Sequence, residues 1–223
     1  MPSPLPAGTV QVSDIRTLAL VGPAAAGKTS LAEALLLQSG AIGAAGSLER
    51  GTTVSDFDPI ERRLQHSLNA SVLHTLHAGT RIHLIDTPGM PDFVGQSLPA
   101  LEAVETAAIV INASTGIEPM AVRMMEYAAA RQLDRIIIVN KIDAQGVDLA
   151  GVLAQIQATF GKECLPLNLP DVGGTKVVDC FYNREGHSDF GSVDSAHRAL
   201  VEQVVEVDAT FVDRYLNDGD VDA

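Results

Sequence analysis

The chain has few aromatic and few basic residues, and it has no tryptophan. Aromatic residues make up 4% of its 223 residues, and 15 lysines and arginines stand against 28 aspartates and glutamates, for a formal net charge of -13. Because charge-driven capture of nucleic acid depends on lysine and arginine neutralising phosphates, this balance argues against binding to naked DNA or RNA. We therefore expect no direct DNA binding.

Cysteine and long apolar runs are also scarce. Cys164 and Cys180 have neither metal-ligand nor disulfide-framework spacing, which is typical of small apolar residues in a reducing compartment. No apolar run approaches the roughly 20 residues of a membrane span, and the first residues lack the features of a signal peptide. These absences predict a cytoplasmic protein without a membrane partner, and we expect a monomer.

Short apolar runs alternate with helical stretches along most of the sequence. This alternation predicts an α/β fold with a mostly parallel sheet that carries helices on both faces. An apolar run that ends at His77 is separated by only three residues from the strand that begins at Arg81. This short separation favours a hairpin and one antiparallel edge strand. We expect strands at 17–22, 81–86, 107–114 and 135–140, and helices at 28–39, 94–105, 118–132 and 147–159.

The composition divides the chain into three parts. Residues 1–15 are rich in proline, glycine and serine and predict a disordered leader. Residues 16–162 hold the strand and helix alternation and form the expected domain core. After residue 162 the sequence is broken up by proline and glycine, so residues 163–223 predict the start of an inserted subdomain that ends in a helix over 193–216.

The sequence GPAAAGKT at residues 22–29 follows an apolar strand and opens a helix, and it has the spacing of a P-loop. Glycines let the backbone turn its N–H groups toward phosphate oxygens, and the helix N-terminus adds partial positive charge. Lys28 is expected to reach the terminal phosphates, and the Thr29 hydroxyl to bind magnesium. The predicted nucleotide contacts of this loop are Gly22, Pro23, Ala24, Ala25, Ala26, Gly27, Lys28, Thr29 and Ser30.

Two further motifs follow at the ends of apolar strands. Asp86 begins DTPG and is expected to hold magnesium, while Gly89 is expected to bring a backbone N–H near the terminal phosphate. NKID ends the strand at 135–140: Asp143 can accept two hydrogen bonds from guanine, which adenine does not offer, while Asn140 and Lys141 complete the motif. The three motifs in this order favour GTP over ATP and disfavour a P-loop kinase.

The chain resembles the translational GTPases, and within them elongation factor G. The resemblance rests on the three motifs, on DTPGMPDF, and on the runs that follow the P-loop and precede NKID, and it covers residues 17–170. It implies magnesium-dependent hydrolysis of GTP to GDP and phosphate during protein biosynthesis, with the ribosome as partner. It also implies that the last guanine-contacting loop lies beyond residue 223, so that the chain is an N-terminal portion of a longer protein.

The resemblance leaves the switch ligand and the hydrolysis rate open. The family's first switch offers magnesium a threonine hydroxyl; we place Ser67 there, with Thr53 as the alternative and an edge-strand start at Ser67 as another. At Met90 the family has a water-orienting histidine, and a thioether cannot orient water. His66 is a candidate replacement.

Other departures from the family also indicate weak or altered hydrolysis. The family's P-loop aspartate is Ala25, and its switch Arg-Gly is Leu64-Gln65. A divergent paralogue that binds guanine nucleotide, hydrolyses it poorly and acts as a regulatory or assembly module is therefore the alternative. Away from the motifs, His187 and His197 have no partner that the sequence identifies, and no further metal site is expected.

Overall fold

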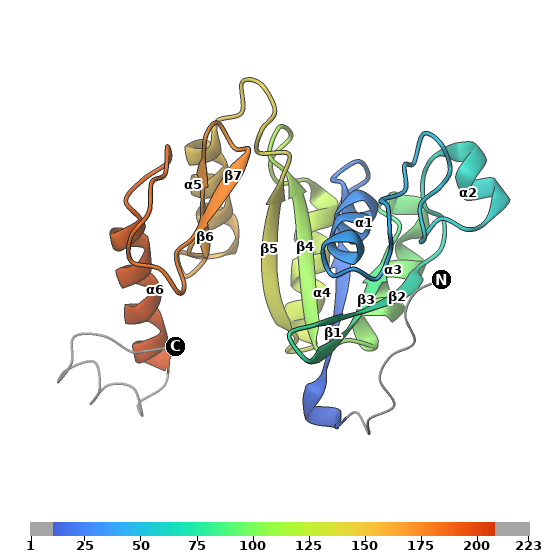
Figure 1. Ribbon diagram of the computed structural model, residues 1–223, viewed down its shortest axis with the longest axis horizontal. Coiled ribbons are helices and arrows are strands. Elements are labelled where there is room, and N and C mark those ends of the chain that lie inside the picture. Colours follow the sequence, from blue (N-terminus) through green and yellow to red (C-terminus); the bar gives the residue numbers. More distant parts are fainter. Residues whose placement is uncertain (1–10, 208–223) are drawn as a thin grey trace. The chain divides into compact units, whose positions relative to one another are not determined.

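The computed structural model describes residues 11–207 of the chain (Figure 1). By internal contacts the chain divides into two compact units, one that ends at Asn140 and one that begins at Lys141. Each unit is described by itself below. None of the helices in the described range combines the length and the apolar character needed to cross a membrane.

The first unit is built on a five-stranded sheet in the order β2-β3-β1-β4-β5. Strand β1 pairs in parallel with β3 and β4, β4 pairs in parallel with β5, and β2 pairs antiparallel with β3. The predicted mostly parallel sheet with one antiparallel edge strand is therefore confirmed. The strands are β1 (Ile15–Val21), β2 (Ser71–His77), β3 (Thr80–Asp86), β4 (Thr106–Asn112) and β5 (Asp134–Asn140).

Helices cover both faces of this sheet, as the alternation of the sequence predicts (Figure 1). Helix α1 packs against β3 on one face, and α3 and α4 pack against β1, β4 and β5 on the other. The helical elements of the first unit are η1 (Val12–Asp14), α1 (Lys28–Gln38), α2 (Pro59–Leu64), η2 (Pro91–Phe93), α3 (Val94–Glu102) and α4 (Pro119–Ala130).

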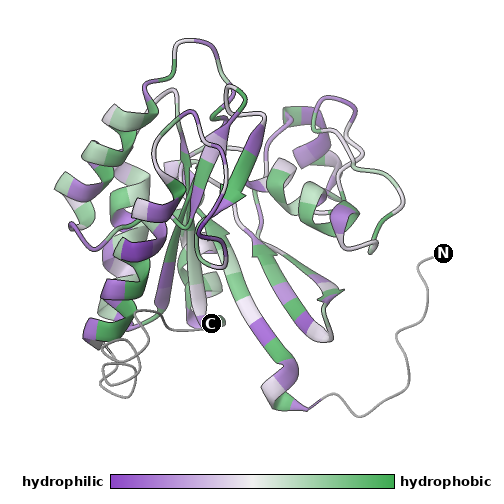
Figure 2. Cartoon of the chain, turned by 60° about the vertical axis from the view of Figure 1, so that its left-hand side comes forward, coloured by the Kyte–Doolittle hydropathy of each residue, from purple (hydrophilic) through white to green (hydrophobic). Residues whose placement is uncertain are grey.

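The core of the first unit follows the alternation of side chains along the strands. Leu20, Leu84 and Val110 share one face and pack with Leu36 of α1 in a single buried cluster. Burial of each such side chain stabilises the fold by about 1.5–3 kcal/mol. Figure 2 shows the central strands as largely hydrophobic, whereas the edge hairpin of β2 and β3 alternates hydrophobic and hydrophilic residues.

The register of the sheet brings three strand ends together. Leu20 pairs with Asp86 between β1 and β3, and Asn112 pairs with Asn140 between β4 and β5. Because parallel strands end at the same edge of a sheet, the loop after β1, the end of β3 and the end of β5 meet there. This edge is where all three sequence motifs begin.

Over residues 141–207, the part of the second unit that the structure describes, there are two helices and a small hairpin. Strands β6 and β7 pair antiparallel, and Leu169, Cys180, Val193 and Leu200 form its buried core. Cys180 is fully buried, as expected for a small apolar residue. The elements are α5 (Leu149–Phe160), β6 (Asn168–Asp171), β7 (Lys176–Asp179) and α6 (Val193–Val207).

The structure bears on three further expectations: the N-terminal leader, the final helix and the boundary between the domain core and the subdomain. The predicted leader is wrong at its end, because η1 forms at Val12–Asp14 and Ile15 pairs with Arg81. The expected final helix is present to residue 207, and its remainder, like residues 1–10, lies outside the described residues. Helix α5 groups with the second unit, while the domain boundary expected after residue 162 stays a prediction.

Candidate functional site

The loop after β1 turns sharply around the Lys28 side chain. Gly22 adopts φ of 133°, and a Cβ there would lie 2.4 Å from the Val110 carbonyl oxygen, so the turn requires glycine. Lys28 Nζ donates to the carbonyl oxygens of Gly22 at 2.9 Å and Pro23 at 2.8 Å. Helix α1 begins at Lys28, which leaves the N–H groups of its first turn available to an anion.

The charge of Lys28 is set by its surroundings. Burial lowers the pKa of its amine to about 8, while the charges of Asp86 and Glu118 act in the opposite direction. An amine with this pKa remains mostly protonated at neutral pH. The loop therefore offers a desolvated cation to a ligand, and that is the type of group that binds phosphate oxygens strongly.

The same loop is supported by the third motif. Asn140 Nδ2 donates to the Ala26 carbonyl oxygen at 2.9 Å, which ties the end of β5 to the loop. Ala25 adopts a left-handed φ of 58°, a conformation that is strained for a residue with a Cβ. Lys141 and Asp143 are exposed and belong to the second unit. Their role in the guanine motif therefore stays a prediction.

Asp86 lies at the end of β3 and is almost completely buried, with 1% of its surface exposed. Its Oδ2 accepts a hydrogen bond of 2.7 Å from Thr29 Oγ1, whereas its Oδ1 has no hydrogen-bond partner among the described residues. Burial raises the pKa of this carboxyl to about 6, and the Thr29 hydroxyl opposes that shift. A buried carboxylate oxygen without a partner is costly unless a cation or a donor satisfies it.

Ser67 reaches the same place from another segment. Its Oγ lies 3.4 Å from Thr29 Oγ1 and donates to Asp56 Oδ1 at 2.7 Å. Thr53 Oγ1 also bonds Asp56, at 3.3 Å to Oδ2, so one carboxylate contacts both candidate switch residues. The alternative that Ser67 begins the edge strand is wrong, because β2 begins at Ser71.

The donor set fits magnesium. Thr29 and Ser67 supply hydroxyl oxygens and Asp86 supplies the unpartnered Oδ1, and Mg²⁺ prefers oxygen ligands. A cation there would also offset the desolvation that raises the pKa of Asp86. Thr29, Ser67 and Asp86 are therefore the residues that would hold the metal.

The DTPG segment is fixed against the P-loop at close range. Thr87 Oγ1 donates to the Leu20 carbonyl oxygen at 2.7 Å, and Ser97 Oγ donates to the Pro88 carbonyl oxygen at 3.0 Å. A Cβ on Gly89 would lie 2.4 Å from Lys28 Nζ and 2.5 Å from the Ala24 amide nitrogen. Only glycine permits this approach.

Met90 and His66 lie beside this segment. Met90 is half-buried and directly precedes η2, which includes Phe93. The His66 ring centroid is 6.3 Å from that of Phe93, and His66 Nδ1 is buried without a hydrogen-bond partner in the part of the chain that the structure describes. The ring of His66, which precedes β2, therefore lies next to the ring of Phe93, which follows β3.

Several residues of this site carry no signal in the sequence. Asp56 bonds Ser67, 11 positions away, and Ser97 bonds the Pro88 carbonyl oxygen, 9 positions away. Glu33 and Glu61 are buried, at 2% and 1% exposure, although helical glutamates are usually solvated. Apart from the local capping box of Asp58 and Glu61, only the folded chain brings the partners of these two glutamates into reach.

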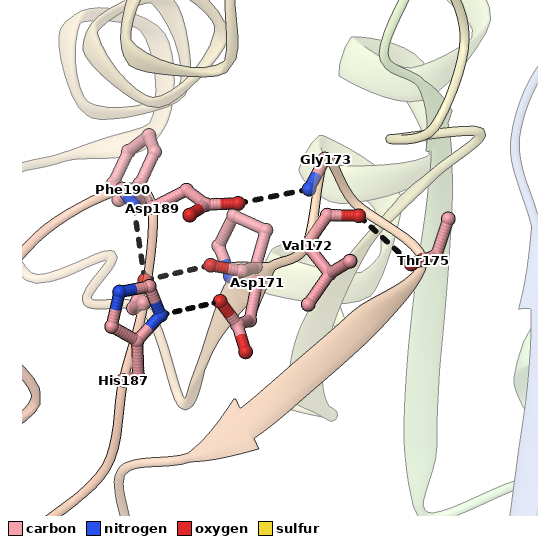
Figure 3. A network of polar contacts seen from close by, with 9 residues as sticks. Asp171, Val172, Gly173, Thr175, His187, Asp189 and Phe190 are labelled. Carbon is pink, nitrogen blue, oxygen red and sulfur yellow. Dashed lines mark hydrogen bonds and ion pairs between the residues drawn. The ribbon is translucent and has the colours of Figure 1, made fainter.

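A second polar cluster lies in the second unit (Figure 3). His187 Nδ1 and Asp171 Oδ1 form an ion pair of 2.7 Å, and Asp189 Oδ2 accepts from the Gly173 amide at 2.8 Å. The sequence identified no partner for His187, and the structure supplies one; His197 likewise bonds the Cys180 carbonyl oxygen at 3.0 Å. One ligand atom from each of Asp171, His187 and Asp189 lies within 4.8 Å of the others, yet existing hydrogen bonds explain the cluster without a cation.

The strand, the glycine loop with its lysine, and the aspartate at the end of the neighbouring strand define a P-loop nucleotide-binding domain. Comparison of the sequence with protein families gives the particular family. Residues 13–216 match the elongation factor Tu GTP binding domain, and the chain belongs to that family.

Individual relatives are translation factors or proteins similar to them. The chain is 32% identical over 221 residues to an elongation factor G-like protein of Mycobacterium tuberculosis, covering 93% of this chain and 31% of the relative. It is 32% identical over 182 residues to peptide chain release factor 3 of Symbiobacterium thermophilum, covering 79% of this chain and 34% of the relative. The chain thus spans about a third of the length of these relatives.

A solved structure agrees with the fold. A crystal structure of a protein from Thermus thermophilus superposes with a TM-score of 0.81 at 33% identity, over 92% of this chain and 33% of that one. The resemblance to translational GTPases noted from the sequence is therefore confirmed.

Gly89→Ala is expected to force the DTPG segment and the P-loop apart, because the new methyl group would overlap backbone atoms of Pro23 and Ala24. We expect the free energy of unfolding to fall by about 1–3 kcal/mol, measured by urea denaturation. Gly95→Ala is the matched control, since a Cβ there meets nothing within 4 Å. An unchanged stability in Gly89→Ala would contradict the close approach.

The ion pair of His187 predicts a pH window for the second unit. The hydrogen bond and charge of Asp171 raise the pKa of His187, and the same bond lowers the pKa of Asp171. The stabilisation is therefore lost as pH rises through the raised histidine pKa, and again as pH falls through the lowered aspartate pKa. An NMR titration should show the His187 pKa above its ordinary value and Asp171→Asn should return it there; an identical titration in both proteins would refute the pairing.

Proposed function

We propose that the chain is the GTP-binding domain of a longer translation factor similar to elongation factor G, and that it hydrolyses GTP to GDP and phosphate. The observation that carries this proposal is the convergence of Lys28, Thr29, Asp86 and Ser67, which come from three segments, on one small site. We assign the domain core to residues 16–162 and a partial inserted subdomain to residues 163–223.

Phosphate binding is the task of the P-loop. The N–H groups around residues 22–29 and the buried amine of Lys28 offset the charge of the phosphates. Magnesium held by Thr29, Ser67 and Asp86 would neutralise charge on the phosphate oxygens when bound. Ser30, which follows Thr29 in α1, completes the set of loop contacts.

Guanine selection is assigned to NKID. The Asp143 carboxylate accepts from the ring N–H and the amino group of guanine, and Lys141 lies along the ring plane. Asn140, the first residue of the motif, donates to the Ala26 carbonyl oxygen of the P-loop within the first unit. A two-point polar match of this kind discriminates between bases by about 10⁴ or more.

The switch consists of residues 46–67 and 86–98. Ser67 approaches Thr29 from the first segment, and Gly89 approaches Lys28 and Ala24 from the second. A nucleotide that carries the terminal phosphate stabilises both approaches, and hydrolysis removes that support. Because the relatives are named as translation factors, we propose the ribosome as the partner that reads this change and the cytoplasm as its location.

A second candidate function is favoured by Met90. Met90 stands beside Gly89, where a thioether neither donates nor strongly accepts a hydrogen bond. Loss of a polar group that orients the attacking water commonly lowers the rate by about 10² to 10⁴. The chain would then bind guanine nucleotide as a regulatory or assembly module, unless His66, which lies beside Phe93, supplies the polar group.

Nucleotide titration tests the proposed function. The 223-residue chain is titrated with fluorescent GDP and with a non-hydrolysable imido analogue of GTP in the presence of magnesium, then challenged with excess ATP. We expect saturable binding that ATP does not displace and that unlabelled GTP does. Lys28→Ala should weaken binding by about 100-fold, since it removes a desolvated cation from the phosphates. Displacement by ATP would contradict guanine selection, and absence of binding would contradict the proposal as a whole.

Met90→His distinguishes the two candidate functions. If hydrolysis is limited by the missing polar group, phosphate release in a single turnover should rise by at least about tenfold. Met90→Leu conserves volume and polarity and serves as the control, so its rate should not change. Both variants should retain the affinity of the original chain for GDP. Rapid hydrolysis by the original chain would exclude the module function.

A further inference from the structure

Glu33 makes an unusual connection between α1 and the first switch segment. It lies one helical turn after Thr29 and is 2% exposed. Its Oε2 accepts from the Gly46 amide at 2.6 Å, and its Oε1 accepts from the Val54 amide at 2.5 Å. Among the described residues no cationic side chain forms an ion pair with it. Both oxygens of one buried carboxylate are thus devoted to two backbone amides eight positions apart.

The residues between these two amides form a closed loop. The Thr52 amide donates to the Ser47 carbonyl oxygen at 3.0 Å, and the Ser47 amide donates to Thr52 Oγ1 at 3.0 Å. A Cβ on Gly46 would lie 2.4 Å from the Thr52 carbonyl oxygen, so the two arms of the loop are in contact. Residues 46–54 therefore form a closed loop, and Glu33 attaches both ends of this loop to α1.

The loop of residues 46–54 is followed in the chain by the residues that contact the proposed switch ligand, Ser67. Val54 is two residues before Asp56, and Asp56 accepts from Ser67 at 2.7 Å. Ser67 in turn lies 3.4 Å from Thr29 Oγ1, so the chain of contacts begins and ends on neighbouring turns of α1. Glu61 is a second buried carboxylate, but its partners Asp58, Leu68 and Asn69 belong to the same region of the chain as Glu61 itself. Glu33 is the one of the two that attaches the segment to α1.

We infer that Glu33 is a positioning residue that anchors residues 46–54 to α1 in every nucleotide state, so that within the first switch segment only residues 55–67 rearrange with the terminal phosphate. The inference rests on the proposed function and deepens it by dividing the first switch into a fixed part and a moving part. Glu33 does not touch the nucleotide site itself. It sets the position from which Asp56 presents Ser67.

Hydrogen exchange in the unaltered chain is the first test. With GDP and with the imido analogue of GTP, the amides of residues 46–54 should exchange equally slowly, whereas those of residues 55–67 should exchange more slowly with the analogue. Exchange of residues 46–54 that changes with nucleotide as much as that of residues 55–67 would overturn the inference. This comparison needs no variant and is independent of any folding defect.

Glu33→Gln is the second test, because it keeps the shape of the side chain while replacing one acceptor with a donor that faces a backbone N–H. Affinity for the GTP analogue should fall by about tenfold, and affinity for GDP should stay within about twofold. A purely structural role would weaken both nucleotides equally. Glu49→Gln is the matched control: Glu49 is exposed in the same segment and its side chain accepts only from the Ser47 hydroxyl, at 3.3 Å, among the described residues.

The outcomes separate the inference from the proposed function. If the unaltered chain binds no guanine nucleotide, the proposed function fails, and exchange in the nucleotide-free chain still tests the anchor: Glu33→Gln must accelerate exchange of residues 46–54 and Glu49→Gln must not. If the unaltered chain binds and Glu33→Gln leaves the ratio of the two affinities unchanged, only the inference fails.

Discussion

The hydrogen bond from Thr29 to Asp86 is the interaction around which the site is organised. It joins the first turn of α1 to the end of β3 at 2.7 Å inside the protein, where both residues are almost fully buried. Burial of Asp86 has a cost, because it raises the pKa of the carboxyl and leaves its Oδ1 without a partner among the described residues. The sheet bears this cost because the neighbouring end of β1 is fully buried at Leu20 and Val21 and is paired with β3 in fixed register.

The fold and the residues of the motifs could be predicted because their signals are local. A continuous apolar strand, a glycine loop and a helix start are neighbours in sequence. The antiparallel edge strand follows from a short connection, which is a two-residue turn of Ala78 and Gly79 in the structure. The sequence also placed Ser67 in the switch, and the structure brings its hydroxyl to Thr29. Its role as a metal ligand stays a prediction.

The supporting residues could not be predicted, since their signals are not local. Asp56 lies among polar residues that are typical of a solvated loop, and Glu33 has the spacing of an ordinary helix surface. Each becomes buried only because a segment far along the chain folds over it. The sequence does not distinguish Thr53 from Ser67 for a related reason: both hydroxyls bond the Asp56 carboxylate, and no sequence pattern indicates a shared partner.

Helix α2 has six residues, whereas isolated helices shorter than about 12–15 residues are marginal in water. Its first turn has a capping box between Asp58 and Glu61, and Glu61 also accepts the amides of Leu68 and Asn69 just after Ser67. The same carboxylate thus completes the helix and fixes the chain beside the switch ligand. Loss of the Glu61 carboxylate would therefore remove the cap of α2 and the two amide contacts next to Ser67 in a single change.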